Sequence, residues 1–162
     1  MSFKTKHGDV TIEGDFSRLE KLVENLGKNY HVDVGVLSAE GSTARGGNTL
    51  AGIGAEHEFG VPDRKPPLPR RSFIRFPLQT GQQQIENQVG RRYQRNIENG
   101  NIEQIFGDIG LASEARIQDA FESGGFGQWK ELSEVTIQRK QSDAILIDTG
   151  ALRQSITSQV DE

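Results

Sequence analysis

Residues 144–150, Ala-Ile-Leu-Ile-Asp-Thr-Gly, form the stretch that most suggests chemistry. A short apolar run into Asp-Thr-Gly is typical of the loop that carries a catalytic carboxylate in aspartic proteases, where two such carboxylates share one proton. A chain with one such loop must dimerise, and that enzyme class needs a flap and a further strand pair, but only twelve residues follow Gly150. We therefore expect Asp148, Thr149 and Gly150 to be structural, with Thr149 or Asp148 capping a short helix over 151–156.

The other candidate catalytic motifs are incomplete. His57-Glu58 has no second histidine four residues from the first, which a zinc protease requires. The pair Gly52-x-Gly54 lacks the third glycine and the preceding strand of a dinucleotide-binding loop. With no cysteine and only three histidines in the chain, we expect no catalytic residue, no metal site and no cofactor. The sequence predicts that the protein is not an enzyme.

Positive charge is concentrated in residues 61–95. The chain as a whole has a net charge of −4, but this segment has eight basic residues against two acidic ones, a net of +6, which leaves −10 for the rest. Such a segment suits docking onto nucleic acid or onto an acidic partner, including a second copy of the chain, although a solvated face remains an alternative. The basic residues are Arg64, Lys65, Arg70, Arg71, Arg75, Arg91, Arg92 and Arg95.

The composition predicts one domain, residues 1–162, rich in loops. Hydrophobic residues make up 33% of the chain, and there are 19 glycines, which favours a globular protein with a modest core. No apolar run is long enough for a signal peptide or a membrane span, so we expect folding in a cytoplasm.

Hydrophobic periodicity predicts helices and strands in alternation. Helices are expected over 15–27, 50–60 (ending at Gly60), from Pro77 to about 99, 102–123, 133–140 and 151–156. Strands are expected over 30–38, 72–76, 144–147 and 156–160. The two long helices should form an antiparallel hairpin, with Trp129 in the core and His31 on the exposed side of its strand.

Two segments lack periodicity. Residues 39–49 are rich in Gly and Ser and predict a flexible loop or a hairpin tip, whereas 61–71, with four prolines, predict an extended basic arm. Both offer too little apolar surface to offset the entropy of ordering, so we expect neighbouring subunits to order them.

Three stretches resemble known families. "AEHEFG" (55–60) and "RSFIRFPL" (71–78) are similar to segments of the neck, or tail-completion, proteins of tailed phages. "WKELSEVTIQRK" (129–140), followed by "ILIDTGALRQSI" (145–156), resembles the virion morphogenesis proteins of Mu-like phages. Both families are head–tail connection proteins.

The resemblance implies an α+β fold, a small antiparallel or mixed sheet flanked by two long helices. It implies a homo-oligomeric ring, with a hexamer favoured and a dodecamer possible, in the virion neck between a head-side connector or stopper and the tail terminator or tail tube. Genome DNA would pass through it without sequence-specific binding, and no membrane is involved. The alternatives are a tail terminator and a nucleic-acid-binding protein that uses residues 64–95.

The resemblance also selects residues. Those expected at the interface with a subunit or partner are Arg64, Lys65, Arg70, Arg71, Phe73 and Arg75. Those expected to form the structural motif are Glu58, Phe59, Gly60, Trp129, Asp148, Thr149 and Gly150. Because the remainder of the chain is acidic, we expect the arginines of 61–75 to bind protein rather than DNA.

Overall fold

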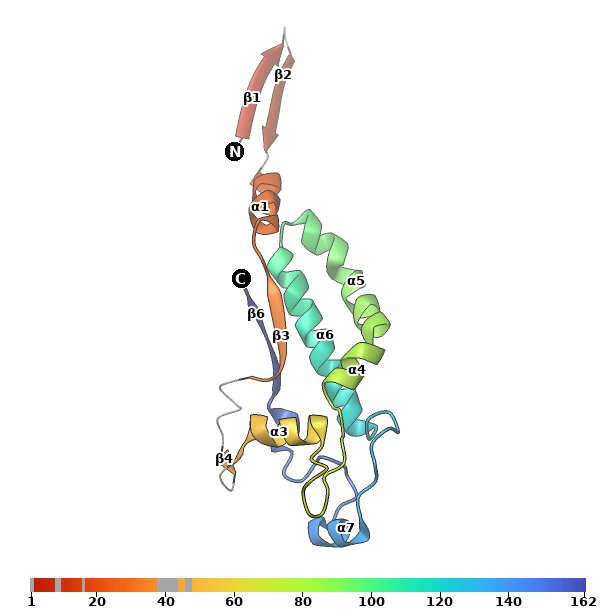
Figure 1. Cartoon of the computed structure of the whole chain (residues 1–162). Helices are drawn as coiled ribbons and strands as arrows, with labels where there is room; N and C mark the ends of the chain where they lie inside the picture. The colour runs from red at the N-terminus through yellow and green to blue at the C-terminus, as the bar shows by residue number, and fades with distance from the viewer. Residues whose placement is uncertain (1, 8–9, 16, 38–43, 46–47) are drawn as a thin grey trace.

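The computed structural model describes residues 2–7, 10–15, 17–37, 44–45 and 48–162. Within these residues the fold is mixed α+β, with seven helices and small two-stranded antiparallel sheets. The centre has three layers (Figure 1): the strand pair β3 (His31–Val36) and β6 (Ile156–Asp161), the helix α6 (Ile102–Glu122), and the helix α5 (Gln82–Glu98). Of the two long helices, α6 packs on the sheet and α5 packs on α6. None of the helices in this part of the chain is both long and apolar enough to cross a lipid bilayer.

The sheet β3–β6 confirms two predicted strands. Its register sets His31 opposite Asp161 and Val36 opposite Ile156. Because side chains alternate along a strand, Val34 and Val36 pack into the core while His31 is exposed, as the sequence predicted.

The helix α6 confirms the helix predicted over 102–123, and it forms the expected antiparallel hairpin with α5. Val89 of α5 packs with buried residues of α6: Ile102, Ile105 and Ala112. The long helix predicted from Pro77 is instead divided into α4 (Arg75–Thr80) and α5, with Gly81 between them. Tyr93, expected in the apolar stripe of this helix, is 49% exposed.

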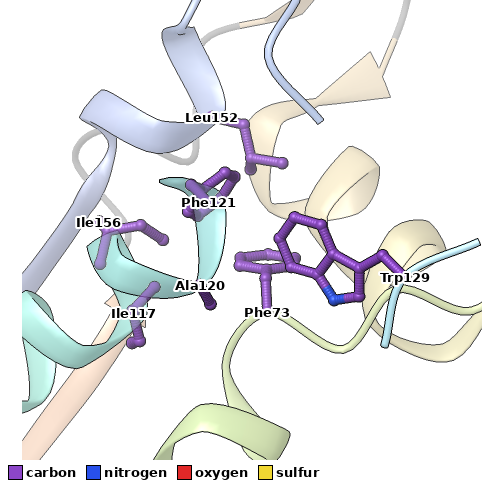
Figure 2. Packing of buried hydrophobic residues seen from close by; sticks show 7 residues of the cluster. All are labelled: Phe73, Ile117, Ala120, Phe121, Trp129, Leu152 and Ile156. Carbon is purple, nitrogen blue, oxygen red and sulfur yellow. The ribbon is translucent and has the colours of Figure 1, made fainter. Parts of the chain in front are cut away.

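The main core lies at the C-terminal end of α6, where Phe73 and side chains from residues 129–156 pack against it (Figure 2). Phe73 and Trp129 both pack against Phe121, with ring centroids 5.3 and 5.9 Å apart. The prediction that Trp129 is buried is therefore confirmed. Phe73, however, is fully buried, so the expectation that it contacts another subunit is wrong. The seven buried residues of this core are Phe73, Ile117, Ala120, Phe121, Trp129, Leu152 and Ile156.

Three shorter helices lie at the same end of the molecule as this core. The helix α3 (Leu50–Phe59) ends at Gly60 as predicted. The helix α7 (Glu134–Lys140) begins after Ser133, whose Oγ accepts a hydrogen bond from the Thr136 N–H at 3.3 Å. The helix α8 (Ala151–Gln154) is shorter than predicted.

The cap of α8 differs from the expected arrangement. Its N-cap residue is Gly150, which has no side chain that could cap. Of the two candidates, Thr149 contributes, because its Oγ1 accepts from the Ala151 N–H at 3.4 Å. Asp148 is exposed in the preceding bend.

Two predicted strands are absent from the described structure. Residues 72–76 form a bend that enters α4, with Ile74 in the right-handed helical region. Residues 144–147 form a turn in which Leu146 has a positive φ of 60°, which a strand does not allow. Both runs are short and apolar, and such runs do not distinguish a strand from buried irregular backbone.

The proline-rich segment 61–71 is a closed loop rather than an extended arm. Val61 and Leu68 bond to each other through both backbone groups, at 2.9 and 3.0 Å. These bonds return the chain on itself within one subunit. That neighbouring subunits order the segment stays a prediction. In the predicted loop 39–49, β4 (Ala44–Arg45) pairs with β5 (Asn48–Thr49), which supports the hairpin alternative; residues 39–43 and 46–47 lie outside the described residues.

The N-terminal end of the chain extends away from the core. The strand β1 (Ser2–His7) pairs antiparallel with β2 (Val10–Asp15), an element that the sequence analysis did not predict. The helix α1 (Ser17–Leu26) follows and confirms the helix predicted over 15–27. Figure 1 shows the β1–β2 hairpin beyond α1, at the end of the molecule opposite α3 and α7.

Candidate assembly interface

Glu58 organises the motif that the sequence singled out. It lies in the last turn of α3, and only 6% of the residue is exposed. Its Oε2 accepts from the N–H groups of Phe73 and Ile74 at 2.8 and 2.9 Å, and its Oε1 accepts from the Arg75 N–H at 3.2 Å. These are N–H groups at the start of α4, which have no partner within their own helix. Glu58 therefore caps a helix that begins far from it in the sequence.

Ser72 completes this cap. Its Oγ donates to Glu58 Oε1 at 2.5 Å and accepts from the Phe76 N–H at 3.0 Å. The negative charge next to the N-terminus of α4 is also favourable for the helix dipole. The carboxylate thus accepts four hydrogen bonds from the chain itself, which is the pattern of a structural carboxylate rather than of a general base.

Gly60 allows the chain to leave α3 in the direction that this cap requires. Its backbone has φ 77° and ψ 164°, a region open essentially to glycine alone. A Cβ at this position would lie 2.9 Å from the Arg70 N, so glycine is also required by space. The neighbouring Phe59 is 59% exposed, and the Arg75 guanidinium lies 5.0 Å from the centre of its ring. The motif therefore has a buried half, Glu58 and Gly60, and an exposed half, Phe59 and Arg75.

Arg71 is part of the buried half, so its expected place at an interface is wrong. Its Nε and one terminal nitrogen donate to the Lys130 carbonyl at 3.1 and 2.9 Å, and its backbone N–H donates to the His57 carbonyl at 2.7 Å. Burial lowers the pKa of the Arg71 guanidinium below its usual value. The side chain joins the segment before α4 to the segment after Trp129, whose Nε1 donates to the Ser72 carbonyl at 3.3 Å.

The other predicted interface residues remain on the surface. Arg64 is exposed and pairs with Glu56 at 3.1 Å, and Arg75 is exposed beside Phe59. Lys65 and Arg70 are exposed in the loop 61–71. The structure therefore keeps four of the six predicted interface residues accessible around one end of α3.

The basic segment also continues into α5, which packs against a buried acid of α6 that sequence reasoning missed. Asp108 of α6 is 7% exposed and accepts from Asn96 at 3.1 Å and from Arg92 at 3.3 Å. Arg71 is buried and the exposed Arg92 is paired with Asp108, so fewer unpaired basic charges lie on the surface than the sequence count of eight suggests. A hydrogen bond between Asn96 and Asp108 cannot be predicted from a single sequence, because it depends on how the two helices pack against each other.

His57 is a titratable group in the same region. Burial is the main reason why the pKa of His57 lies below its usual value, and the positive charge of Arg71 lowers it further. Arg64 and Lys140 act in the same direction, while Glu56 opposes them. Among the described residues the buried Nδ1 has no hydrogen-bond partner, so the site favours the neutral imidazole.

We expect the fold to lose stability in mild acid, partly through His57. Between the depressed pKa and the usual value of about 6.5, the unfolded state binds more protons at His57 than the folded state does. The free energy of unfolding therefore falls as the pH drops from about 7 through this window. Urea unfolding at several pH values should show a shallower fall for His57→Gln than for the wild type; equal slopes would exclude this role.

An apolar stripe on α1 is the clearest unpartnered feature of the described surface. Leu19, Val23 and Leu26 are four and three residues apart, which places them on one side of a helix, and they are 54%, 61% and 64% exposed. The helix is held to the body by its other edge, where Leu22 packs on the α5–α6 core and Asn25 Nδ2 donates to the Gly100 carbonyl at 2.5 Å. The apolar face of α1 is therefore wider than its contact with the rest of the chain.

No protein-family model matches the chain, and neither a curated protein nor a solved structure is significantly similar to it. The class of protein that the fold and the site define is a mixed α+β chain with an internally capped structural motif, an exposed basic loop and an exposed apolar helix face.

Proposed function

We propose that the protein is a structural subunit of the neck of a tailed phage, a tail-completion or head–tail connector protein that forms a ring. The resemblance of three sequence stretches suggests this function. In the ring, the subunit contacts copies of itself, a head-side connector or stopper protein, and the tail terminator or tail tube. It acts by binding proteins, and it performs no catalysis.

The observation that carries the proposal is the exposed stripe Leu19, Val23 and Leu26. Fully burying one such side chain contributes about 1.5–3 kcal/mol, so a helix that repeats three of them on one side is suited to a protein partner. The adjacent β1–β2 hairpin points the same way, because an isolated two-stranded hairpin is marginally stable in water. Together these elements give one end of the subunit an incomplete surface.

The buried carboxylates also support a structural role. Glu58 accepts four hydrogen bonds and Asp108 accepts from Asn96 and Arg92, so these acids are occupied by groups of the chain. The exposed residues Arg64, Lys65, Arg70 and Arg75 form the second candidate contact surface, here proposed to bind an acidic surface of a neighbour. If these basic residues bind protein, the ring makes only weak contacts with the phosphates of DNA, which suits a channel through which DNA slides.

We expect the double variant Val23→Lys/Leu26→Lys to weaken self-association about 100-fold or more. Placing two charges in a desolvated apolar contact removes burial and adds a desolvation cost, and a 100-fold change corresponds to about 2.7 kcal/mol. Native mass spectrometry of the wild type, in solution and recovered from particles, should show multiples of 17.9 kDa, with six copies favoured.

The exposed Glu24 on the same helix provides the matched control, since Glu24→Lys adds charge outside the stripe. Circular dichroism should show that all variants are folded, because Leu22 and Asn25 still attach α1 to the body. A wild-type chain that stays monomeric in particles, or that is monomeric and binds duplex DNA with a steep salt dependence, would refute the ring and favour the nucleic-acid alternative.

A further inference from the structure

The geometry points to a binding site for a divalent transition-metal ion on the outer face of the β3–β6 sheet, formed by His31, Asp33 and Asp161. One potential ligand atom from each of these three side chains lies within 4.8 Å of those of the other two. This proposal replaces the sequence expectation of no metal site, and it does not depend on the proposed function.

The strand register places these side chains together. His31 is directly opposite Asp161, and Asp33, two residues further along β3, is opposite Gln159. Residues two apart on a strand point to the same face, so all four side chains are on the face opposite the valines that pack towards α6. His31 and Asp33 are exposed, and Asp161 is partly exposed, so an ion can reach them from solvent.

The ligand atoms are largely free of other partners. Within the described residues the side chains of His31 and Asp33 make no hydrogen bond or ion pair, and Asp161 accepts one hydrogen bond, from Gln159 at 2.8 Å. Nearby Lys28 is engaged elsewhere, because it pairs with Glu162 at 3.0 Å, an interaction that raises the pKa of its ammonium group. Two carboxylates and an imidazole therefore meet on an open face.

The donor set selects the kind of ion. One imidazole nitrogen and two carboxylate oxygens suit Zn²⁺ and its first-row neighbours. Ca²⁺ takes six to eight oxygen ligands, and Mg²⁺ keeps most of its water, so neither is matched by three side chains that include a nitrogen. In a tetrahedral zinc site the ligand atoms lie about 2.0–2.2 Å from the metal and somewhat less than 4 Å from one another. The three atoms here lie within 4.8 Å of one another, so a small side-chain rotation brings them to that separation.

A bound ion would join the two strands at the end of the sheet where the chain terminates. Asp161 is the last residue of β6 and His31 is the first of β3. The ion would thus hold the final strand to the sheet from its solvent face, and it should reduce local opening of β6.

The test is titration of tag-free, EDTA-dialysed protein with ZnCl₂ by calorimetry. We expect one saturable Zn²⁺ per chain, at least tenfold weaker binding for His31→Gln and for Asp161→Asn, and no comparable binding of Mg²⁺. The controls are His57→Gln and Asp143→Asn, a histidine and an exposed carboxylate away from the site, which should bind as the wild type does. Zn²⁺ should also slow amide exchange over 156–161 in the wild type and not in Asp161→Asn.

These outcomes decide the proposal whether or not the protein forms a ring. Equal Zn²⁺ affinity in His31→Gln and the wild type would place the ion elsewhere, and absence of saturable binding would remove the site. Binding of Mg²⁺ as tight as that of Zn²⁺ would reduce it to a general acidic patch. Because His31 is exposed, metal-free His31→Gln should melt within a few degrees of the wild type, so lost binding will not reflect unfolding.

Discussion

We expect Glu58→Ala to lower the free energy of unfolding by about 3–5 kcal/mol, one of the two largest effects among the variants considered. The substitution removes the acceptor of three backbone N–H groups at the start of α4 and of the Ser72 hydroxyl. Each buried group left without a partner costs about 1–3 kcal/mol, and water will re-solvate part of the set. Urea unfolding followed by far-UV circular dichroism will measure the change.

The matched control is Glu56→Ala, on the same helix and two residues away. Glu56 is partly exposed and pairs with Arg64 on the surface, where an ion pair contributes about 0–1 kcal/mol. We therefore expect a loss below about 1 kcal/mol. If Glu56→Ala and Glu58→Ala were equally destabilising, the cap of α4 would not be the reason for the presence of glutamate at position 58.

The sequence predicted well those elements whose pattern is local. The helices α1 and α6 have apolar residues at helical spacing, α1 and α3 end just before the stop signals Gly27 and Gly60, and β3 shows clear alternation. Each of these signals is carried by residues within one element, so no knowledge of the rest of the fold is needed to interpret it.

The failed predictions concern segments whose conformation is set by distant contacts. The break between α4 and α5 falls at Gly81, where a Cβ would lie 2.4 Å from the Arg116 Nε of α6. Residues 72–76 enter a helix rather than a strand because Glu58 accepts their N–H groups. In the loop 61–71 the prolines suggested extension, but the Val61–Leu68 bonds close it. None of these long-range contacts could be inferred from local composition.

The candidate interface was predicted only in part for the same reason. Composition identified a basic segment but could not separate exposed arginines from buried ones, and it gave no indication that Leu19, Val23 and Leu26 would remain exposed. An amphipathic pattern predicts that a helix has an apolar face, but whether the chain itself covers that face depends on tertiary packing. In α1 the apolar face that the sequence predicts is not covered by the rest of the described chain.

The same charge reversal should destabilise the fold strongly at Arg71 and hardly at all at its neighbour Arg70. Arg71 is 5% exposed and its guanidinium donates twice to the Lys130 carbonyl. In Arg71→Glu a buried carboxylate, which can only accept, faces that carbonyl, so both hydrogen bonds are lost and a charge is buried without a partner. Removing one side of a buried charged interaction costs about 3–5 kcal/mol, and we expect a loss of this size in urea unfolding.

Arg70 is exposed, so Arg70→Glu should change the free energy of unfolding by about 0.5 kcal/mol or less. This difference determines how the basic loop must be tested in assembly. In a variant that reverses both arginines, failure to assemble could come from the lost stability of the Arg71 change, whereas Arg70→Glu alone keeps the fold and changes only the surface. If folded Arg70→Glu no longer enters particles, this outcome supports the proposed contact of the loop with a neighbouring subunit or another protein. If Arg71→Glu is as stable as the wild type, the guanidinium does not join the segments before α4 and after Trp129, and Arg71 returns to the set of possible interface residues.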